Sequence, residues 1–128
     1  MISIRIAIGT IALICSPVML QAATADSPLN GVWASDFGDI RLSEKQGEVS
    51  GSYVTDDGRI IGTFDGAVIE GFWVETASDY TCETTKLGSA HWGRVRFELN
   101  RAGTGWTGIW SHCDYEYVPG AVWNARRK

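Results

Sequence analysis

Apolar and polar residues alternate along most of the chain, and a glycine recurs among the apolar positions. In the stretch "VIEGFWVE" (68–75), Ile69, Gly71 and Trp73 occupy every second position. Residues two apart lie on the same face of a β-strand, so the pattern predicts a strand whose Ile69 and Trp73 point into a core. The apolar-x-Gly-x-aromatic unit recurs at Leu29–Trp33, Val49–Tyr53, Ile60–Phe64 and Trp106–Trp110, with a weaker version at Val118–Val122.

No part of the chain shows a sustained 3.6-residue period, and turn signals recur every ~8–12 residues, so we expect strands throughout. Short turns join most of them, which makes neighbouring strands antiparallel. The sequence predicts an all-β fold: a small antiparallel up-and-down (meander) β-barrel of about eight strands, in which closure removes exposed edges. The expected strands are 29–34, 39–44, 48–55, 59–64, 68–75, 92–99, 105–111 and 118–125.

The inward face of this barrel is rich in aromatic side chains. Eight strands enclose a space that side chains can just fill, or that can hold one small ligand. Inward glycines let strands approach closely, and the aromatic two residues along is expected to fill the space each glycine leaves. A packed core is favoured, with a ligand cavity as the alternative. The expected interior residues are Leu29, Trp33, Ile40, Leu42, Val49, Tyr53, Ile60, Phe64, Ile69, Trp73, Val95, Phe97, Leu99, Trp106 and Trp110.

The opposite faces of the strands are polar, as at Arg41 and Ser43 or Arg94 and Arg96. A barrel that spans a membrane needs an apolar outer band and strands of about 9–11 residues. We therefore expect a soluble barrel that is not embedded in a membrane.

Residues 1–25 have the features of a cleavable signal peptide. Arg5 precedes an apolar run, and Ala23-Thr24-Ala25 supplies the small residues of a cleavage site. A lipid anchor on Cys15 is disfavoured because Ile14 stands where a small residue is needed. We expect a periplasmic or secreted protein whose residues 26–128 form a single domain.

Cys82 and Cys113 remain after the leader is removed, and in an exported protein such a pair predicts a disulfide. In a meander, the loops after the odd-numbered strands emerge at one end, and both cysteines fall in such loops. Without Arg5, the chain has ten basic and fifteen acidic residues. This acidic balance disfavours nucleic acid as a partner, and the basic "ARRK" at the end is interpreted as a solvated terminus.

Gly31-Val32-Trp33, Gly38-Asp39 and Gly51-Ser52-Tyr53 follow one another at the spacing of a known barrel family. That family opens with a Gly-x-Trp strand, then a Gly-Ser turn, then "TGTY". Residues 30–66 thus resemble the first four strands of avidin and streptavidin. The resemblance covers roughly a third of residues 26–128 and implies a meander barrel.

The departures from the family fall on its ligand positions. Ser35 stands where the family has an Asn, and Asp39 replaces the turn Ser that binds the ureido oxygen of biotin. An ionised Asp39 accepts hydrogen bonds but cannot donate one. Tyr53 matches the family's tyrosine, and Thr55 could stand for the serine beyond it. The resemblance implies the architecture, and biotin binding is not expected.

Acidic and aromatic residues gather in the loops expected at the disulfide end. The loop 76–91 is long for so small a domain, and "SHCDYEY" (111–117) follows the seventh strand. Tyrosines in such loops are typical anchors of binding surfaces, and Glu75 lies near this end of its strand. The candidate binding residues are Ser35, Asp39, Tyr53, Tyr80, His91, His112, Asp114, Tyr115 and Tyr117.

The sequence offers little for catalysis or metal binding. With both cysteines bridged, His91 and His112 leave no zinc spacing, and nothing matches a calcium loop, so we expect no metal and no cofactor. Ser111 and His112 are neighbours on opposite faces of a strand, so they do not form a nucleophile–base pair.

We therefore expect a non-catalytic binding protein whose loop rim holds a protein partner, by analogy with small inhibitor or immunity proteins. The alternative is a barrel that holds a small molecule in a cavity lined by Tyr53, Trp73, Trp106 and Trp110. A third hypothesis is an enzyme that acts on glycans through paired carboxylates of the rim.

Overall fold

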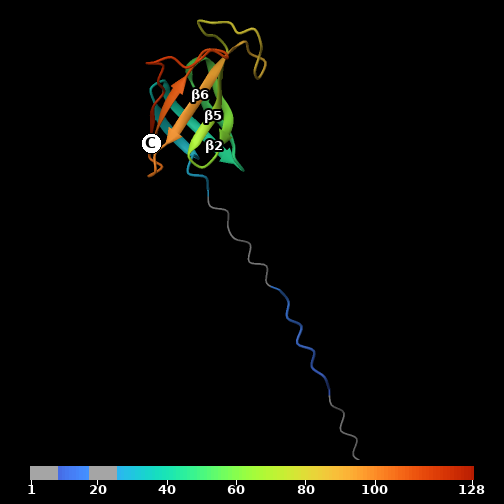
Figure 1. Cartoon of the computed structure of the whole chain (residues 1–128). Helices are drawn as coiled ribbons and strands as arrows, with labels where there is room; N and C mark the ends of the chain where they lie inside the picture. Colours follow the sequence, from blue (N-terminus) through green and yellow to red (C-terminus); the bar gives the residue numbers. More distant parts are fainter. Residues whose placement is uncertain (1–8, 18–25) are drawn as a thin grey trace, which may run out of the picture.

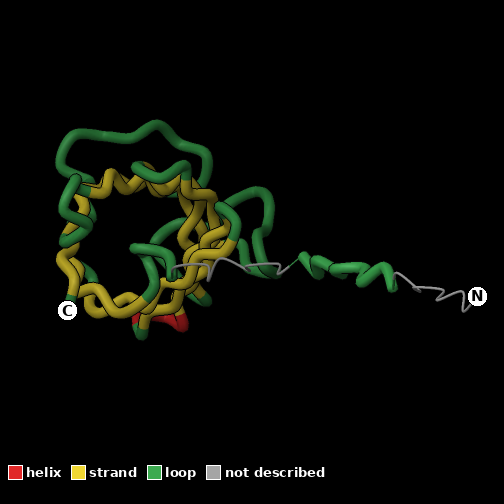
Figure 2. Tube along the Cα trace, turned by 90° about the horizontal axis from the view of Figure 1, so that it is seen from below, coloured by secondary structure: helices red, strands yellow, loops and turns green. Residues whose placement is uncertain are grey.

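The computed structural model describes residues 9–17 and 26–128, and it confirms the predicted closed meander barrel. Within these residues, eight antiparallel strands pair in sequence order and the last pairs with the first, which gives the ring seen end-on in Figure 2. They are β1 (Gly31–Ser35), β2 (Gly38–Lys45), β3 (Glu48–Tyr53), β4 (Gly58–Phe64), β5 (Val68–Glu75), β6 (His91–Leu99), β7 (Gly105–Trp110) and β8 (Ala125–Arg127).

Helical structure is minor in the described part of the chain, where it amounts to the short 3₁₀ turn η1 (Thr55–Asp57) between β3 and β4. None of the described residues form a helix long and apolar enough to cross a membrane. Residues 9–17 are exposed and hold neither helix nor strand, and the predicted cleavage site at 23–25 lies outside the described residues.

The interior predicted from the alternating pattern is confirmed. Twelve of the fifteen expected residues are buried in one cluster, and Phe64, Leu99 and Trp110 pack against it while partly exposed. At its centre Trp106 stacks on Phe97, with ring centroids 4.8 Å apart, and meets Trp33 at a tilt of 44° over 4.9 Å. Trp123, which was not predicted to be inside, also belongs to this core and is 3% exposed.

The glycines accommodate aromatic rings, but the ring comes from the neighbouring strand and not from two residues along. Trp73 on β5 lies opposite Gly93 on β6, where an added Cβ would come within 2.5 Å of the indole Nε1. Tyr53 in the same way covers Gly58, and Phe97 covers Gly108. In each case the aromatic ring that fills the space beside the glycine belongs to the residue paired with it on the neighbouring strand. The expectation that the aromatic two residues along the same strand fills this space is therefore wrong.

Gly71 has a different role from these ring-covered glycines. It lies opposite Gly62 on β4, and a Cβ at Gly71 would sit 2.0 Å from the carbonyl oxygen of Ile61. The two glycines therefore allow β4 and β5 to approach more closely than side chains would permit.

The eighth strand is shorter and later than predicted. Residues 118–124 are mostly irregular: Val118 is 60% exposed, Gly120 has φ of +87°, and Val122 makes only an isolated bridge to Ile109. The strand is instead Ala125–Arg127, which pairs with both β1 and β7. The basic "ARRK" segment thus closes the barrel through its backbone, which was not expected. Its basic residues Arg126, Arg127 and Lys128 are exposed, as expected of a solvated terminus.

The two ends of the barrel differ. At the end where the chain enters, Leu29 is fully buried and the Arg127 guanidinium lies 4.4 Å from the centre of the Trp33 ring. The loops after β1, β3, β5 and β7 emerge at the other end, which we call the mouth. The loop 76–90 stands at the top of Figure 1 beside the segment that leads to the C-terminus.

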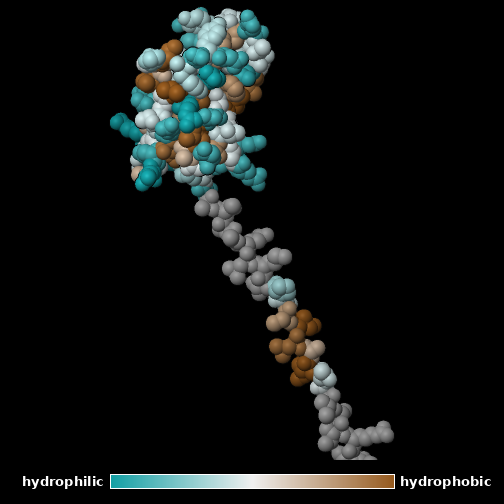
Figure 3. Space-filling model, viewed as in Figure 1, coloured by the Kyte–Doolittle hydropathy of each residue, from teal (hydrophilic) through white to brown (hydrophobic). Residues whose placement is uncertain are grey.

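The disulfide Cys82–Cys113 is confirmed, and it joins the loops after β5 and β7 as the meander requires. It lies in a second apolar cluster with Val74, Trp92 and Phe72 on the outer wall of β5 and β6. The long loop covers this cluster, and Lys86 lies 3.9 Å from the centre of the Phe72 ring. Elsewhere, polar and apolar side chains are interspersed over the outer face seen in Figure 3.

Candidate functional site

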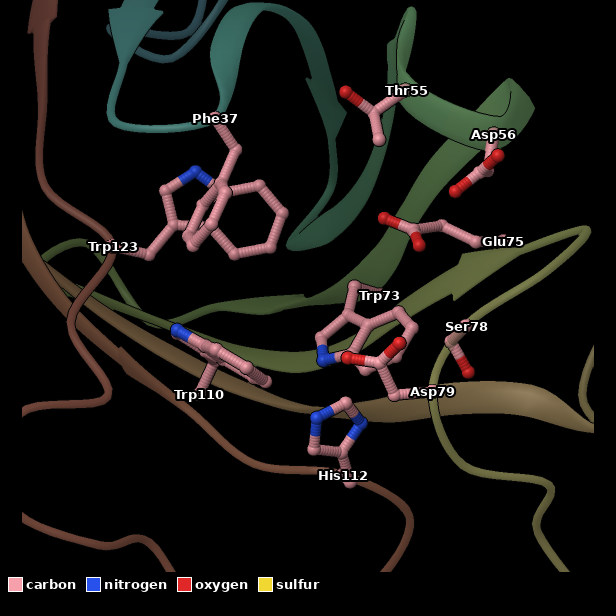
Figure 4. A pocket seen from close by; sticks show the side chains of 10 residues that line it. All are labelled: Phe37, Thr55, Asp56, Trp73, Glu75, Ser78, Asp79, Trp110, His112 and Trp123. Carbon is pink, nitrogen blue, oxygen red and sulfur yellow. The ribbon is translucent and has the colours of Figure 1, made fainter.

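A cavity of about 260 Å³ opens at the mouth, above the packed core. Four of its walls are aromatic rings, contributed by Phe37 from the β1–β2 turn, Trp73 from β5, Trp110 from β7 and Trp123 from the segment before β8. In Figure 4, Phe37, Trp110 and Trp123 lie to the left and Trp73 at the centre, while Asp56 and Glu75 lie to the right and Asp79 overlaps Trp73 in this view. We call this space the mouth cavity.

The aromatic wall is held in place by edge-to-face contacts and by hydrogen bonds. Trp73 and Trp110 meet at an interplanar angle of 78°, and Phe37 meets Trp110 at 87°. Trp73 Nε1 donates to the carbonyl oxygen of Ser111 over 2.9 Å, and Trp123 Nε1 donates to Ser35 Oγ over 2.9 Å. Rings fixed in this way present a preformed surface to a ligand.

Glu75 ends β5 on the inward side, two residues after Trp73. It accepts a hydrogen bond of 2.8 Å from the hydroxyl of Tyr53, a neutral donor. Burial raises the pKa of Glu75 above its ordinary value, while this hydrogen bond acts in the opposite sense. Burial, together with the charge of Glu75, raises the pKa of Tyr53 far above its ordinary value, so the hydroxyl keeps its proton. The pair therefore places a partly desolvated carboxylate at the edge of the cavity.

Asp56 and Asp79 bring further acidic groups to the cavity from two loops. Asp56 lies in η1 with a left-handed backbone (φ 46°), and its carbonyl oxygen accepts from the backbone N–H of Thr76 over 2.9 Å. Asp79 belongs to the loop after β5, next to Ser78, whose hydroxyl contacts His91 Nδ1 at 3.0 Å. The two loops are thus tied to the barrel on either side of Glu75.

His112 lies among aromatic rings in the wall of the cavity, just after the end of β7. Its ring centre is 5.0 Å from that of Trp110, 5.6 Å from Trp73 and 4.4 Å from Tyr80. Its Nδ1 is buried without a hydrogen-bond partner in the described part of the chain. Burial lowers the pKa of His112, against the opposing charge of Asp79, so the ring is neutral at neutral pH.

The structure brings some of the predicted binding residues to the mouth cavity and leaves others outside. Tyr53, Tyr80 and His112 are within contact of its lining, Ser35 holds Trp123, and His91 steadies the loop through Ser78. Asp39 pairs with Lys128 at 2.6 Å on the outer wall, and Tyr117 lies under the Arg94 guanidinium at 4.6 Å. Asp114 and Tyr115 are exposed in the loop after β7.

Phe37 and Trp123 were missed among the candidate residues. Phe37 sits in the turn "SDFG" (35–38) between the first two strands, and an aromatic residue in a tight turn at the binding end is the available signal. Trp123 lies in the stretch 118–125, which is expected to be the eighth strand, and no residue of that stretch is among the expected interior residues. The irregular path of residues 118–124 brings Trp123 into contact with Phe37 and Tyr53, at centroid distances of 4.9 and 5.3 Å.

Another hollow, of about 870 Å³, lies on the outer wall between Val32, Arg41 and Ser52. Its rim carries the ion pair Lys128–Asp39, and most of its side chains are exposed and polar. A ligand pocket is more often concave, apolar and equipped with a few converging polar groups, which describes the mouth cavity. Among the described residues, no group of three or more His, Cys, Asp or Glu side chains has an arrangement that could hold a metal ion.

Comparison with known proteins gives no family assignment. The chain matches no protein family, no curated protein and no solved structure. The resemblance of residues 30–66 to avidin and streptavidin therefore stays a prediction, and the function is argued from the mouth cavity itself.

Proposed function

We propose that this protein is an exported, non-catalytic binding protein that holds a small organic ligand in the mouth of its barrel. The observation that carries the proposal is the mouth cavity: about 260 Å³, walled by Phe37, Trp73, Trp110 and Trp123, with a filled core below it. The disulfide Cys82–Cys113 beside it supports an oxidising compartment.

The size and walls of the cavity favour a small molecule. Its volume lies just below the roughly 300–1,000 Å³ of common ligand pockets, so it suits a compact ligand. Trp73 is 4% and Trp123 3% exposed, so these rings are already fixed before a ligand arrives. Little ordering free energy is then lost on binding.

A fragment screen tests the proposal. Neutral, anionic and cationic fragments are offered to the protein, and binding is measured by ligand-observed NMR. Hits are expected to lose affinity about 3- to 10-fold in Phe37→Ala, because an aromatic contact contributes roughly 0.5–1.5 kcal/mol. Val54→Ala is the control, since this side chain is 94% exposed in a neighbouring loop. The proposal would be overturned if no fragment binds, or if the fragments that bind have the same affinity for Phe37→Ala as for the unaltered protein.

Binding of a protein partner through the rim is a second candidate. It is supported by exposed apolar and aromatic side chains in the loops at the mouth: Val54 is 94%, Tyr80 52%, Tyr115 59% and Val118 60% exposed. Clusters of this kind are common at interaction surfaces. If the rim binds a partner, Asp114→Lys with Glu116→Lys should abolish its capture from envelope extract, and capture that survives these changes would reject the rim.

A further inference from the structure

We propose that the ligand of the mouth cavity is a small organic cation: an ammonium group carried on a compact apolar body. This inference rests on the function proposed above and names the chemical class that the cavity selects. It combines the charge of the lining with an aromatic wall over which none of the described basic side chains lies.

The lining is acidic without a compensating base. Asp56, Glu75 and Asp79 approach the cavity from η1, β5 and the loop after β5, whereas no lysine or arginine is among the described residues that line it. The Glu75 carboxylate accepts a hydrogen bond from the neutral hydroxyl of Tyr53, and His91, opposite Glu75 on β6, is the basic residue that acts on its charge. A partly buried carboxylate is stabilised by an opposite charge, and a bound cation would provide it.

Two acidic side chains on the outer wall are arranged differently. There Asp39 is paired with Lys128 at 2.6 Å, and Glu70 is paired with Arg96. The protein thus has basic groups close to these exposed acids and none in the wall of the mouth cavity. The charge of the cavity is left for a ligand to balance.

The aromatic rings inside and outside the cavity also differ in whether a basic side chain lies over them. Outside the cavity, basic side chains lie over ring faces: Lys86 over Phe72 and Trp92, Arg94 over Tyr117, and Arg127 over Trp33, at 3.9–4.6 Å from the ring centres. Within the described chain, no such contact is formed by the rings of the mouth cavity. Aromatic faces attract cations, most strongly those of tryptophan, so these rings can serve an ammonium ligand.

The other ligand classes fit less well. An anion would face three carboxylates at close range, and these interactions are repulsive. A neutral ligand would displace water from the Glu75 carboxylate without offering an opposite charge in its place. Binding would then carry the cost of desolvating the carboxylate. His112 does not offset this charge, because its ring is neutral at neutral pH.

Two probes of the same shape test the charge directly. Choline and 3,3-dimethylbutan-1-ol differ by a quaternary nitrogen in place of a carbon, and each is titrated into the protein by calorimetry. We expect choline to bind about tenfold more tightly, as a desolvated cation–π contact implies. Equal affinities, or preference for the neutral or an anionic probe, would overturn the inference while leaving small-ligand binding intact.

A matched pair of variants on one strand locates the effect. Glu75→Gln keeps an acceptor for Tyr53 and removes the charge, so choline affinity should fall about 5- to 10-fold while affinity for the neutral probe is unchanged. Glu70→Gln is the control, since Glu70 lies on the outer wall of the same strand. Equal loss in both variants, or none in Glu75→Gln, would contradict the assignment. Denaturant unfolding of each variant establishes that the fold is retained.

Phosphatidylcholine vesicles distinguish a free ligand from a membrane headgroup. The proposal predicts that free choline binds and that the protein does not sediment with the vesicles. Sedimentation without binding of free choline would overturn it. If neither choline nor any fragment of the screen binds, the proposed function itself fails.

Discussion

At the residue scale, Glu75 is the group whose ionisation couples to a bound cation. Its pKa is raised by burial, so the free protein holds the Glu75 proton at a higher pH than an exposed glutamate does. A cation in the cavity favours the ionised form and therefore displaces this proton. Tyr53 remains neutral throughout, because its pKa is raised as well.

Choline affinity should therefore fall as the pH drops through the raised pKa of Glu75. Protonation of His112, whose pKa is lowered, acts in the same direction at acidic pH because it adds positive charge beside Asp79. Calorimetric titrations from pH about 4 to about 8 measure the dependence. Glu75→Gln should remove the part due to Glu75. Affinity that is constant or rises in acid would contradict this coupling.

Gly93 shows how little space remains behind the aromatic wall. An added Cβ would lie 1.8 Å from the Ser111 carbonyl oxygen and 2.5 Å from Trp73 Nε1, so it would break the hydrogen bond between them. Gly93→Ala should lower the free energy of unfolding by at least about 2 kcal/mol, measured in denaturant. Ser50→Ala, on the exposed face of β3, should change it by less than about 0.5 kcal/mol. If Gly93→Ala leaves the free energy of unfolding unchanged, the aromatic wall is loosely packed.

At the element scale, alternation of apolar residues was enough to predict seven strands and their inward faces, because most of these strands have a buried and an exposed side. β5 and β6 also bury Val74 and Trp92 on the outer wall beside the disulfide. β8 did not follow this rule. Val118 and Val122 imitate the pattern although both are exposed, while the true strand carries two arginines. Its place is determined by pairing with β1 and β7, which local sequence does not encode.

Arg127 makes β8 a structural element of the closed end. Its guanidinium lies over the Trp33 ring and donates to the carbonyl oxygens of Asn30, at 2.9 Å, and Pro28. Arg127→Ala should lower the free energy of unfolding by about 1–2 kcal/mol. The adjacent Arg126→Ala should cost less than about 0.5 kcal/mol, and equal effects would argue that β8 closes the barrel by its backbone alone.

At the scale of the whole molecule, one end of the barrel is plugged and the other is open. Sequence placed Trp73 and Trp110 inside and Glu75 near the binding end, yet it could not show that a void remains. Whether a barrel interior is filled depends on how side chains from several strands pack together, and Trp123 and Phe37 enter from irregular segments. The sequence therefore predicts which end of the barrel holds the candidate site, but only some of the residues that line it.

The disulfide ties two of the loops that surround the mouth. Cys82 and Cys113 are 31 residues apart, so their reduction, or the double variant Cys82→Ser and Cys113→Ser, should lower the free energy of unfolding by roughly 3.5–4 kcal/mol. Chemical denaturation with and without reductant measures this difference. A change close to zero would mean that the second apolar cluster, with Trp92 and Phe72, holds the loops without the bond.

The central claim is that a small cation occupies the mouth cavity, and indole NMR tests it most directly. With ¹⁵N-labelled tryptophan, each indole N–H of the protein gives its own signal during a choline titration. The account predicts that the signals of Trp73, Trp110 and Trp123 shift with a common dissociation constant. Those of Trp33 and Trp106 in the core and of Trp92 on the outer wall should stay in place. Shifts confined to Trp92, or none at any of the six, would contradict it.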